Sequence, residues 1–545
     1  MPAISPSPSP PSPLPPGREG RSRIWGCAGA LRPHNPKFAN FPLLRSGARV
    51  GGWGLIIVVL AYLISACTGG RPNLTASPTS LSSTPLISAS PSLLSPTPLI
   101  PATPTEAPPP PALPPTHYTL TAVLNYALHH LVVDEGIEYT NRSPQALDQL
   151  LLMAEPVYFP GTFDLKGMAW GDGTAITDFR RDGSRIILPL PQPLEPGEAI
   201  TLSLNYELSL PSPVPSPDLR PIPFGYTTRQ TNLVDWYPYI PPYKPGEGWL
   251  AHSAGYFGEH QVYETADFDV SLHILDERGD LIVAASAPAH KEGDWRRYEY
   301  DDARNFALSV SPEYRVYTAT VGTTTVISYA FGFHETAGQA VLQTTAEALE
   351  LYNRLYGPYP RPLFSAIEAD FLDGMEYDGL YFLSNGFYNL YQGQPGDYLV
   401  SIAAHETAHQ WFYAQVANDQ ALEPWLDEAL CTYSERLFYE NKYPDALKWW
   451  WDYRVNYYQP QGWVDGSIYN PAGYRPYRDA VYLNGALFLE ALRKQVGDEA
   501  FFAFIKDYVA QMSGKIATRQ DFFRILGEHT TNDLSPLLKV YFQAP

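Results

Sequence analysis

The hydrophobic pattern of the chain changes its period near residue 330. Between residues 118 and 329, apolar and polar residues alternate in short runs that are separated by turns rich in Gly and Pro. Alternation with a period of two predicts antiparallel strands. From about Thr336 onward, apolar residues recur every three or four positions, which predicts helices. The sequence therefore predicts an α+β multidomain protein, in which an antiparallel β-rich domain is followed by a mainly helical one.

Helical periodicity in the second region is concentrated in four segments. The first has apolar residues on one face and ends in Gly, which is typical of an amphipathic helix and its carboxyl cap. Pro424 suits the first turn of the third segment, because a backbone N–H at that position has no helical partner and proline lacks this N–H. A short β-like passage at 364–382 precedes the second helix. The four predicted helices are 337–357, 398–416, 423–442 and 484–497.

The first 116 residues differ in composition from the rest. Residues 1–53 are rich in Pro, Ser and Arg, and residues 68–116 consist largely of Ser, Thr, Pro, Ala and Leu. Such segments cannot bury enough apolar surface to offset the entropy of ordering the chain, so we expect both to be disordered. The expected domains are then 117–330 for the β-rich part and 331–545 for the helical part.

An apolar segment at residues 54–67 separates these two stretches. Its apolar run, Leu55–Ala66, is short for a membrane span and fits the core of a signal peptide. The run ends in Ile64-Ser-Ala-Cys67, which resembles a bacterial lipobox and implies lipidation of Cys67. The alternative is an uncleaved apolar anchor. Both interpretations export the chain and hold it at the outer face of a bacterial membrane.

Charge and cysteine content restrict the partners and cross-links of the chain. The formal charge of −20 and the pI of about 5.0 argue against a nucleic-acid partner, which requires clustered Lys and Arg. If Cys67 carries lipid and Cys27 is removed with the leader, Cys431 has no partner for a disulfide. We therefore expect the exported domains to depend on their cores and on any bound metal.

The stretch His405-Glu-Thr-Ala-His-Gln-Trp-Phe412 lies in the second predicted helix. On a helix, His405 and His409 are one turn apart and point the same way, so both imidazoles can reach one ion. A catalytic zinc takes three protein ligands and keeps one position for water. Glu428, on the next predicted helix, is the candidate third ligand. The expected cofactor is therefore one Zn²⁺ per chain.

Glu406 follows His405 directly but is rotated by about 100° around the helix axis. The rotation places its carboxylate beside the metal and outside the ligand set. A general base is needed at that place, because a metal lowers the pKa of the attacking water and a carboxylate can then accept its proton. Glu406 is therefore the predicted general base.

These residues resemble the signature of a known family. HETAHQWF, followed by Glu428 in a Trp-Leu-Asp-Glu context, is similar to the zinc signature of the membrane alanyl aminopeptidases, gluzincins of the aminopeptidase N type. The resemblance implies that Glu428 is the third ligand. It also implies an aminopeptidase-type β domain followed by a thermolysin-like zinc peptidase domain. We expect a short form that lacks the large carboxy-terminal helical domain of many relatives.

The same family has a G-x-M-E-N motif, whose glutamate holds the free amino terminus of the substrate. This chain has Asp373-Gly-Met-Glu-Tyr377, so the resemblance implies substrate binding by Gly374 and Glu376, with Tyr377 in place of the Asn. A family tyrosine that precedes a helix start matches Tyr482. The resemblance implies that the hydroxyl of Tyr482 stabilises the oxyanion.

The remaining candidate residues carry weaker signals. Glu435 lies seven residues after Glu428 and shares its helix face, and the resemblance implies that it orients a zinc histidine. Cys431 is expected to be a buried and inert thiol. Gln230 is a candidate for binding the substrate amine, which the loose match in the β domain leaves open. Five histidines show no ligand spacing and are expected to be structural: His129, His130, His252, His260 and His334.

The expected function is the hydrolysis of peptides at their free amino terminus, with Glu406 as general base for a metal-activated water. Two alternatives remain. The first is a thermolysin-like endopeptidase on the same metal site, against which Glu376 argues. The second is a catalytically silent surface module that binds peptides or glycans through the β domain and its aromatic residues, which are abundant at 14% of the chain.

Overall fold

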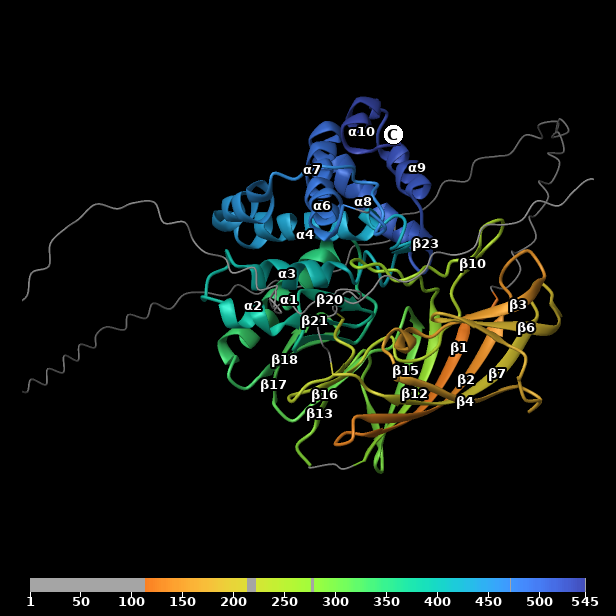
Figure 1. Ribbon diagram of the computed structural model, residues 1–545. Coiled ribbons are helices and arrows are strands. Elements are labelled where there is room, and N and C mark those ends of the chain that lie inside the picture. Colours follow the sequence, from red (N-terminus) through yellow and green to blue (C-terminus); the bar gives the residue numbers. More distant parts are fainter. Residues whose placement is uncertain (1–112, 213–221, 276–278, 471, 545) are drawn as a thin grey trace, which may run out of the picture. The chain divides into compact units, whose positions relative to one another are not determined.

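The computed structural model describes residues 113–212, 222–275, 279–470 and 472–544, which all belong to one compact unit (Figure 1). The leader, the apolar segment with Cys67 and most of the predicted linker lie outside these residues. Disorder, export and lipidation therefore stay predictions. Within the described residues, no helix combines the length and the apolar character that a membrane crossing requires.

The described chain begins with a β-rich region, as the alternating pattern predicts. Its largest sheet has seven strands in the order β14-β15-β12-β1-β2-β7-β4. β1 and β12 pair in parallel, whereas β1 and β2 form an antiparallel hairpin. The strands are β1 (Thr116–Asn125), β2 (His130–Thr140), β4 (Phe163–Trp170), β7 (Ala199–Ser209), β12 (Ala266–Leu275), β14 (His290–Glu292) and β15 (Trp295–Ala303).

Alternation along β1 shows why this sheet has one buried face. Tyr118, Leu120, Ala122 and Leu124 are buried, and the residues between them are half-buried or exposed. Three smaller sheets complete the region. They contain β3 (Leu147–Met153), β5 (Arg180–Asp182) and β6 (Arg185–Leu194); β8 (Gly225–Tyr226), β9 (Thr231–Leu233), β13 (Ile282–Ala285) and β16 (Leu308–Ser311); and β10 (Tyr243–Lys244) with β11 (Gly248–Trp249).

A five-stranded sheet leads into the helical region, with the order β17-β18-β19-β21-β20. By its strand pairing this sheet begins at Tyr314, before the boundary expected at residue 330. The hairpin β17-β18 alternates like the strands before it, so its sequence does not show that it pairs with β19. The strands are β17 (Tyr314–Val321), β18 (Thr324–Phe331), β19 (Leu363–Ala369), β20 (Gly374–Tyr377) and β21 (Leu380–Ser384).

Helix α1 lies between β18 and β19 in the chain, and the other α-helices follow the last strand of this sheet (Figure 1). The four predicted helices correspond to α1, α3, α4 and α7. The α-helices are α1 (Glu335–Leu355), α2 (Asn385–Leu390), α3 (Tyr398–Ala408), α4 (Trp425–Lys442), α5 (Leu447–Trp449), α6 (Tyr474–Arg478), α7 (Gly485–Val496), α8 (Asp498–Met512), α9 (Arg519–His529) and α10 (Ser535–Tyr541). Short 3₁₀ and π segments and one strand pair complete the elements: η1 (Glu155–Tyr158), η2 (Pro444–Ala446), η3 (Trp450–Val455), η4 (Asn456–Tyr458), η5 (Asp479–Asn484), β22 (Ala417–Asn418) and β23 (Ile516–Ala517).

Helix α3 is shorter than predicted. It ends at Ala408, with His409 as its carboxyl cap, whereas the apolar pattern continues to Val416. Trp411 and Phe412 are buried, but they fill the helical core from a turn and not from a helix. Apolar spacing reports burial, and a tightly packed turn buries its residues as well as a helix does.

Arg304 joins the β-rich region to the helical region. Its side chain is buried and its guanidinium donates to the backbone carbonyls of Tyr263, Ala414, Gln415 and Lys515. These acceptors belong to three separate segments of the chain. Burial lowers the pKa of Arg304 to about 10. Four carbonyl dipoles partly replace the lost hydration, so the arginine fixes how the segments meet.

Glu135 of β2 generates a test of this fold. Its side chain points into the β-rich core near Tyr206, and burial raises the pKa of its carboxyl well above the ordinary value of 4.5. Above pH 4.5 the unfolded chain loses a proton that the folded chain keeps, so stability falls as the pH rises. We expect Glu135→Gln to raise the free energy of unfolding by roughly 1–3 kcal/mol at pH 7, and to have little effect at pH 4.

Urea unfolding of both chains at pH 4, 5.5 and 7 measures this difference. The exposed Glu138 of the same strand provides the matched control. Glu138→Gln should change stability by less than about 0.5 kcal/mol at every pH. A Glu135→Gln effect that does not depend on pH would contradict the predicted buried, protonated carboxyl.

Candidate metal centre

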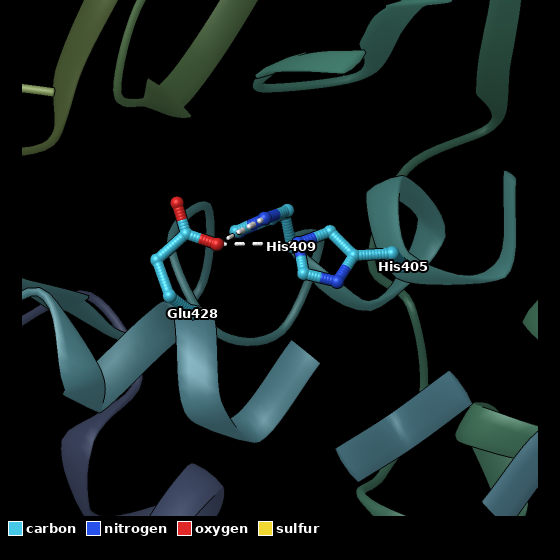
Figure 2. Close-up of side chains that lie close together, drawn as sticks. All are labelled: His405, His409 and Glu428. Atoms are coloured by element: carbon cyan, nitrogen blue, oxygen red, sulfur yellow. Dashed lines mark hydrogen bonds and ion pairs between the residues drawn. The ribbon is translucent and has the colours of Figure 1, made fainter. Parts of the chain in front are cut away.

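Three side chains from α3, its carboxyl cap and α4 converge on one point (Figure 2). The ligand atoms of His405, His409 and Glu428 all lie within 4.8 Å of one another, and all three residues are buried. Glu428 Oε2 lies 3.2 Å from His405 Nε2 and 3.7 Å from His409 Nε2. The structure therefore brings together the three predicted zinc ligands, although 18 residues separate His409 from Glu428 in the sequence.

Both histidines are oriented through their second ring nitrogen. His405 Nδ1 lies 2.9 Å from Glu435 Oε1, and His409 Nδ1 lies 3.2 Å from the carbonyl oxygen of Phe412. In each case a proton on Nδ1 satisfies the acceptor and leaves the lone pair of Nε2 for a metal. Burial lowers the pKa of His409 well below its ordinary value, which favours the neutral ligand form.

Glu435 stands at the centre of a buried network. Its carboxylate accepts from Ser401 Oγ at 2.5 Å, from Trp450 Nε1 at 2.8 Å and from two nitrogens of Arg454 at 2.8 and 2.9 Å. Burial alone would raise the pKa of Glu435, but the charge of Arg454 and the bond from His405 lower it to about 2. The carboxylate that orients His405 is thus held in place by hydrogen bonds to both of its oxygens.

The π-helical segment η3 supplies two members of this network. Trp450 and Arg454 lie on it four residues apart, and both reach Glu435. A second π-helical segment, η5, carries Tyr482. The hydroxyl of Tyr482 donates to Glu428 Oε1, and its ring stacks parallel to that of His405. π-helical turns are rare and often occur at functional sites, because they re-aim side chains.

Glu406 lies beside the triad without belonging to it. A Cβ added to Gly374 would lie 2.0 Å from Glu406 Oε1, so only glycine allows β20 to come this close to the carboxylate. Glu406 Oε2 is buried and has no hydrogen-bond partner among the described residues. Burial raises the pKa of Glu406 well above its ordinary value, and the carboxylates of Glu376 and Glu428 add to the shift.

Glu376 of β20 faces the same centre. Its carboxylate, that of Glu406 and a ring nitrogen of His409 also lie within 4.8 Å of one another. Gln420 Nε2 donates to Glu376 Oε1 and to Asp427 Oδ2, each at 3.1 Å. The predicted amine-binding carboxylate is therefore held in position from the segment just before α4.

A small pocket adjoins Glu376. Its volume of about 10 Å³ has room for one group the size of a water molecule. Besides Glu376, two further acids from the β-rich region, Asp235 and Glu259, line it. Glu259 also lies close enough to Glu428 to raise the pKa of that carboxyl, after the larger effect of burial. The other lining residues are Gln261, Tyr263, Met375, Tyr377, Tyr413 and Gln420.

Sequence reasoning did not find Arg454, Glu259 or Gln420. None has a fixed spacing from the zinc motif, and their partners come from other segments. Gln230 is a candidate for binding the substrate amine, but its side chain bonds to other residues. It donates to Asn232 and Tyr314 and accepts from the backbone N–H of Asp370.

The other residues without ligand spacing have structural surroundings. Cys431 is a buried free thiol whose Sγ lies 3.9 Å from the carbonyl oxygen of Phe412. His252, His260 and His334 pair with carboxylates outside the triad. Those carboxylates belong to Asp419, Glu155 and Glu368.

The motif before the triad departs from the family pattern at two positions. When Met375 and Glu376 are aligned with G-x-M-E-N, the motif glycine falls on Asp373. Asp373 has a φ of 75°, a left-handed conformation that glycine adopts easily and aspartate adopts at a cost. Tyr377, in place of the Asn, directs its hydroxyl to Asp235 Oδ2 at 3.4 Å.

The donor set fits a zinc ion. Two imidazole nitrogens and one carboxylate oxygen are the ligands of many catalytic zinc sites, and each histidine here has an acceptor behind it. The buried carboxylates of Glu376, Glu406 and Glu428 also lie close together, which a divalent cation would compensate. His405, His409 and Glu428 would hold the ion.

Arg454→Met generates a test of the network behind His405. Without the arginine, Glu435 loses the two bonds that fix its plane, so the ring of His405 becomes less well oriented. We expect the zinc dissociation constant to rise by roughly 10- to 100-fold. Competition with a chromogenic chelator measures it, and the visible spectrum of the Co²⁺-loaded protein reports the ligand geometry.

Arg493 provides the matched control. It is as buried as Arg454 and makes a bidentate pair with Asp498 at 2.9 Å, but it contacts no residue of the triad. Arg493→Met should lower stability and leave zinc affinity unchanged. Equal zinc affinities in the two variants would show that Arg454 acts only on stability.

Three comparisons relate the chain to known proteins. A model of the peptidase family M1 domain matches residues 340–541. The chain is 24% identical over 159 residues to a leucyl aminopeptidase of Saccharolobus solfataricus, which is 27% of this chain and 20% of that protein. It is 25% identical over 155 residues to human aminopeptidase O, which is 23% of this chain and 19% of that protein. These matches span about a fifth of the length of the curated relatives.

Solved structures share the fold over a larger part of the chain. A point mutant of an M1 zinc metallopeptidase from Deinococcus radiodurans has a TM-score of 0.56 and 20% identity, covering 79% of this chain and 94% of that one. A two-domain M1 zinc metallopeptidase bound to L-arginine has a TM-score of 0.57 and 20% identity, covering 78% and 93%. The order of a β-rich region followed by a helical region is thus confirmed. The matched residues 340–541 contain His405, His409 and Glu428, so the part of the chain that carries the candidate metal centre is similar to the peptidase family M1 domain.

Proposed function

We propose that the protein is a zinc-dependent aminopeptidase that removes residues from the amino termini of peptides. One observation carries this proposal. The carboxylate of Glu376 lies next to Glu406 and His409, at a small pocket that Asp235 and Glu259 also line. An acidic pocket of this size beside a metal site can bind an ammonium group, but it has no room for a longer chain.

The first step is the placement of the substrate. Its terminal ammonium would pair with Glu376, which Gln420 holds in position. The cavity of about 10 Å³ accepts one group of this size. Because the first residue is anchored there, the peptide bond that follows it lies beside Glu406. Exopeptidase selectivity then results from charge pairing at a fixed distance from the base.

The chemical step requires a base, an electrophile and an oxyanion partner. A zinc ion held by the triad supplies a Lewis acid and lowers the pKa of water. Glu406 would take a proton from the attacking water, whose oxygen bonds to the peptide carbonyl carbon. Tyr482 would donate its hydroxyl to the oxyanion. Glu406 would then pass the proton to the leaving nitrogen as the C–N bond breaks.

Several solved structures with this fold support peptides as the substrate class. Those proteins are described as bound to L-arginine, to L-tryptophan and to a Tyr-Ser-Ala substrate. The acidic residues around Glu376 in this chain fit the common element of these molecules, a free amino group. A thermolysin-like endopeptidase would need room for more of the peptide beyond Glu376, where the pocket of about 10 Å³ accepts only one small group.

Glu406→Gln tests the role of the base. Glutamine keeps the size of the side chain but cannot accept the proton, so we expect kcat to fall by at least about 100-fold. Zinc content should stay near one ion per chain, because Glu406 lies outside the ligand set. Hydrolysis of alanyl-coumarin and metal analysis of the purified protein measure both. A kcat within a few-fold of the parent would contradict the assignment.

Glu376→Gln tests the recognition of the amine. Loss of the charge on Glu376 should raise KM for peptides with a free amino terminus and lower kcat/KM by roughly 10- to 1000-fold. The parent should not cleave the same peptides after acetylation of their amino terminus. Cleavage of acetylated peptides at internal bonds, with no loss in the variant, would identify an endopeptidase instead.

A further inference from the structure

We propose that Asp373 selects peptides whose second residue carries a cationic side chain. The second residue is the one that follows the cleaved bond. The inference rests on the proposed aminopeptidase function and adds a substrate class to it. It follows from the order of residues along β20, the conformation of Asp373 and the absence of a competing cation at that place.

The order of residues on β20 gives the direction of the substrate. Glu376 and Gly374 are two positions apart and lie on the same face of the strand. Glu376 marks the terminal ammonium, and Gly374 lies against Glu406, the base that acts at the cleaved bond. The substrate therefore runs from Glu376 past Gly374, and the next residue of the protein in this direction is Asp373. A substrate bound in this direction would bring the residue after the cleaved bond near Asp373.

Asp373 is held in an unusual conformation. Its φ of 75° is unfavourable for a residue with a side chain, and such strain is often retained at functional sites. The side chain is exposed, and its Oδ2 accepts from the hydroxyl of Tyr474 at 3.2 Å. Tyr474 belongs to α6, so two distant segments meet at this carboxylate. Asp373 forms no ion pair with any residue in the described part of the chain.

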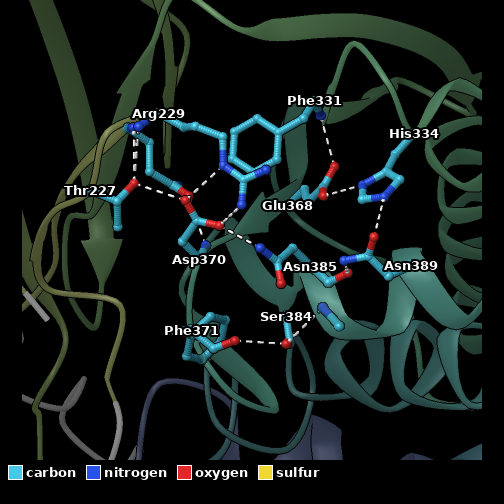
Figure 3. Close-up of polar contacts among 12 residues, drawn as sticks. Thr227, Arg229, Phe331, His334, Glu368, Asp370, Phe371, Ser384, Asn385 and Asn389 are labelled. Carbon is cyan, nitrogen blue, oxygen red and sulfur yellow. Dashed lines mark hydrogen bonds and ion pairs between the residues drawn. The ribbon is translucent and has the colours of Figure 1, made fainter. Parts of the chain in front are cut away.

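The segment that leads to Asp373 is fixed on both sides (Figure 3). Asp370 accepts from Arg229 and Thr227 of the β-rich region, and also from Asn385 of α2. The carbonyl oxygen of Phe371 accepts from Ser384 Oγ at 2.7 Å, as Figure 3 shows. The carbonyl oxygen of Asp373 itself accepts from the N–H of Ser384 at 2.8 Å. The carboxylate of Asp373 is therefore presented from a rigid backbone.

Two arginines contribute positive charge near Tyr474, and both are already paired. Arg454 forms its bidentate bond with Glu435. Arg478 pairs with Asp479, and its guanidinium lies 4.0 Å from the ring centre of Tyr458. Arg454 lies close enough to interact with the charge of Asp373 but forms no ion pair with it, so the carboxylate can still pair with a ligand.

The surroundings of Asp373 fit a long cationic side chain. Leu372 is 63% exposed and Tyr474 is 46% exposed, so both offer apolar surface to the stem of a Lys or Arg. An arginine can also stack on the ring of Tyr474 while it pairs with Asp373. An acidic second residue would meet Asp373 and the carboxylates of the metal centre with the same sign of charge.

Peptides that differ only at the second residue test the inference. Ala-Arg-Gly-Gly, Ala-Gln-Gly-Gly and Ala-Glu-Gly-Gly share the terminal residue and the cleaved bond, and chromatography of released alanine gives kcat/KM for each. We expect the zinc-loaded parent to prefer the Arg peptide over the Gln peptide by roughly two- to tenfold, and the Glu peptide to be the poorest. The preference should weaken in 0.5 M salt.

Asp373→Asn is the decisive variant, because asparagine tolerates the left-handed conformation and removes only the charge. The ratio between the Arg and Gln peptides should fall to about one. Glu299→Gln, at an exposed position of β15, changes the net charge equally and should keep the parental ratio. A parental ratio in Asp373→Asn, or a parent without preference, would overturn this inference. If the parent released no alanine from any of the three peptides, the proposed aminopeptidase function would fail instead.

Discussion

Compensation of buried negative charge is the constraint on which this structure depends. Glu376, Glu406 and Glu428 are all buried around the two histidines, and Glu259 lies beside them. Carboxylates at such distances cannot all be ionised without a cation, and burial raises the pKa of both Glu406 and Glu428. A divalent ion between His405, His409 and Glu428 would resolve this conflict. Such an ion would be part of the charge balance of the folded core.

Residues behind the predicted zinc ligands hold those ligands in position. Glu435 differs from the other buried carboxylates because Arg454 neutralises it, and its pKa falls to about 2. It can therefore remain an acceptor for His405 Nδ1. The pKa values of Glu406 and Glu435, which lie on two neighbouring helices, shift in opposite directions. Burial and the nearby carboxylates raise that of Glu406, whereas Arg454 and His405 lower that of Glu435. π-Helical geometry in η3 places that arginine and Trp450 on the same carboxylate.

The β-rich region forms part of the site and does more than cover it. Asp235 and Glu259 come from this region and line the cavity beside Glu376. Arg304 binds carbonyl oxygens of both regions, and Arg229 holds Asp370 ahead of β20. The acidic pocket beside Glu376, on which the proposed aminopeptidase function rests, therefore forms only where the two regions meet.

The sequence by itself determined that His405, Glu406 and His409 lie within one turn of a helix, which predicts two metal ligands with a base beside them. Glu428 is the candidate third ligand on the next predicted helix, and the role of Glu435 is implied by the family resemblance. The sequence also determined the order of strands and helices, since apolar residues recur every two positions in strands and every three or four positions in helices. Only the tertiary structure decided the partners that come from distant segments: Arg454 behind Glu435, Glu259 beside Glu376 and Tyr474 against Asp373. No local period encodes such contacts, because they depend on how whole elements pack against one another.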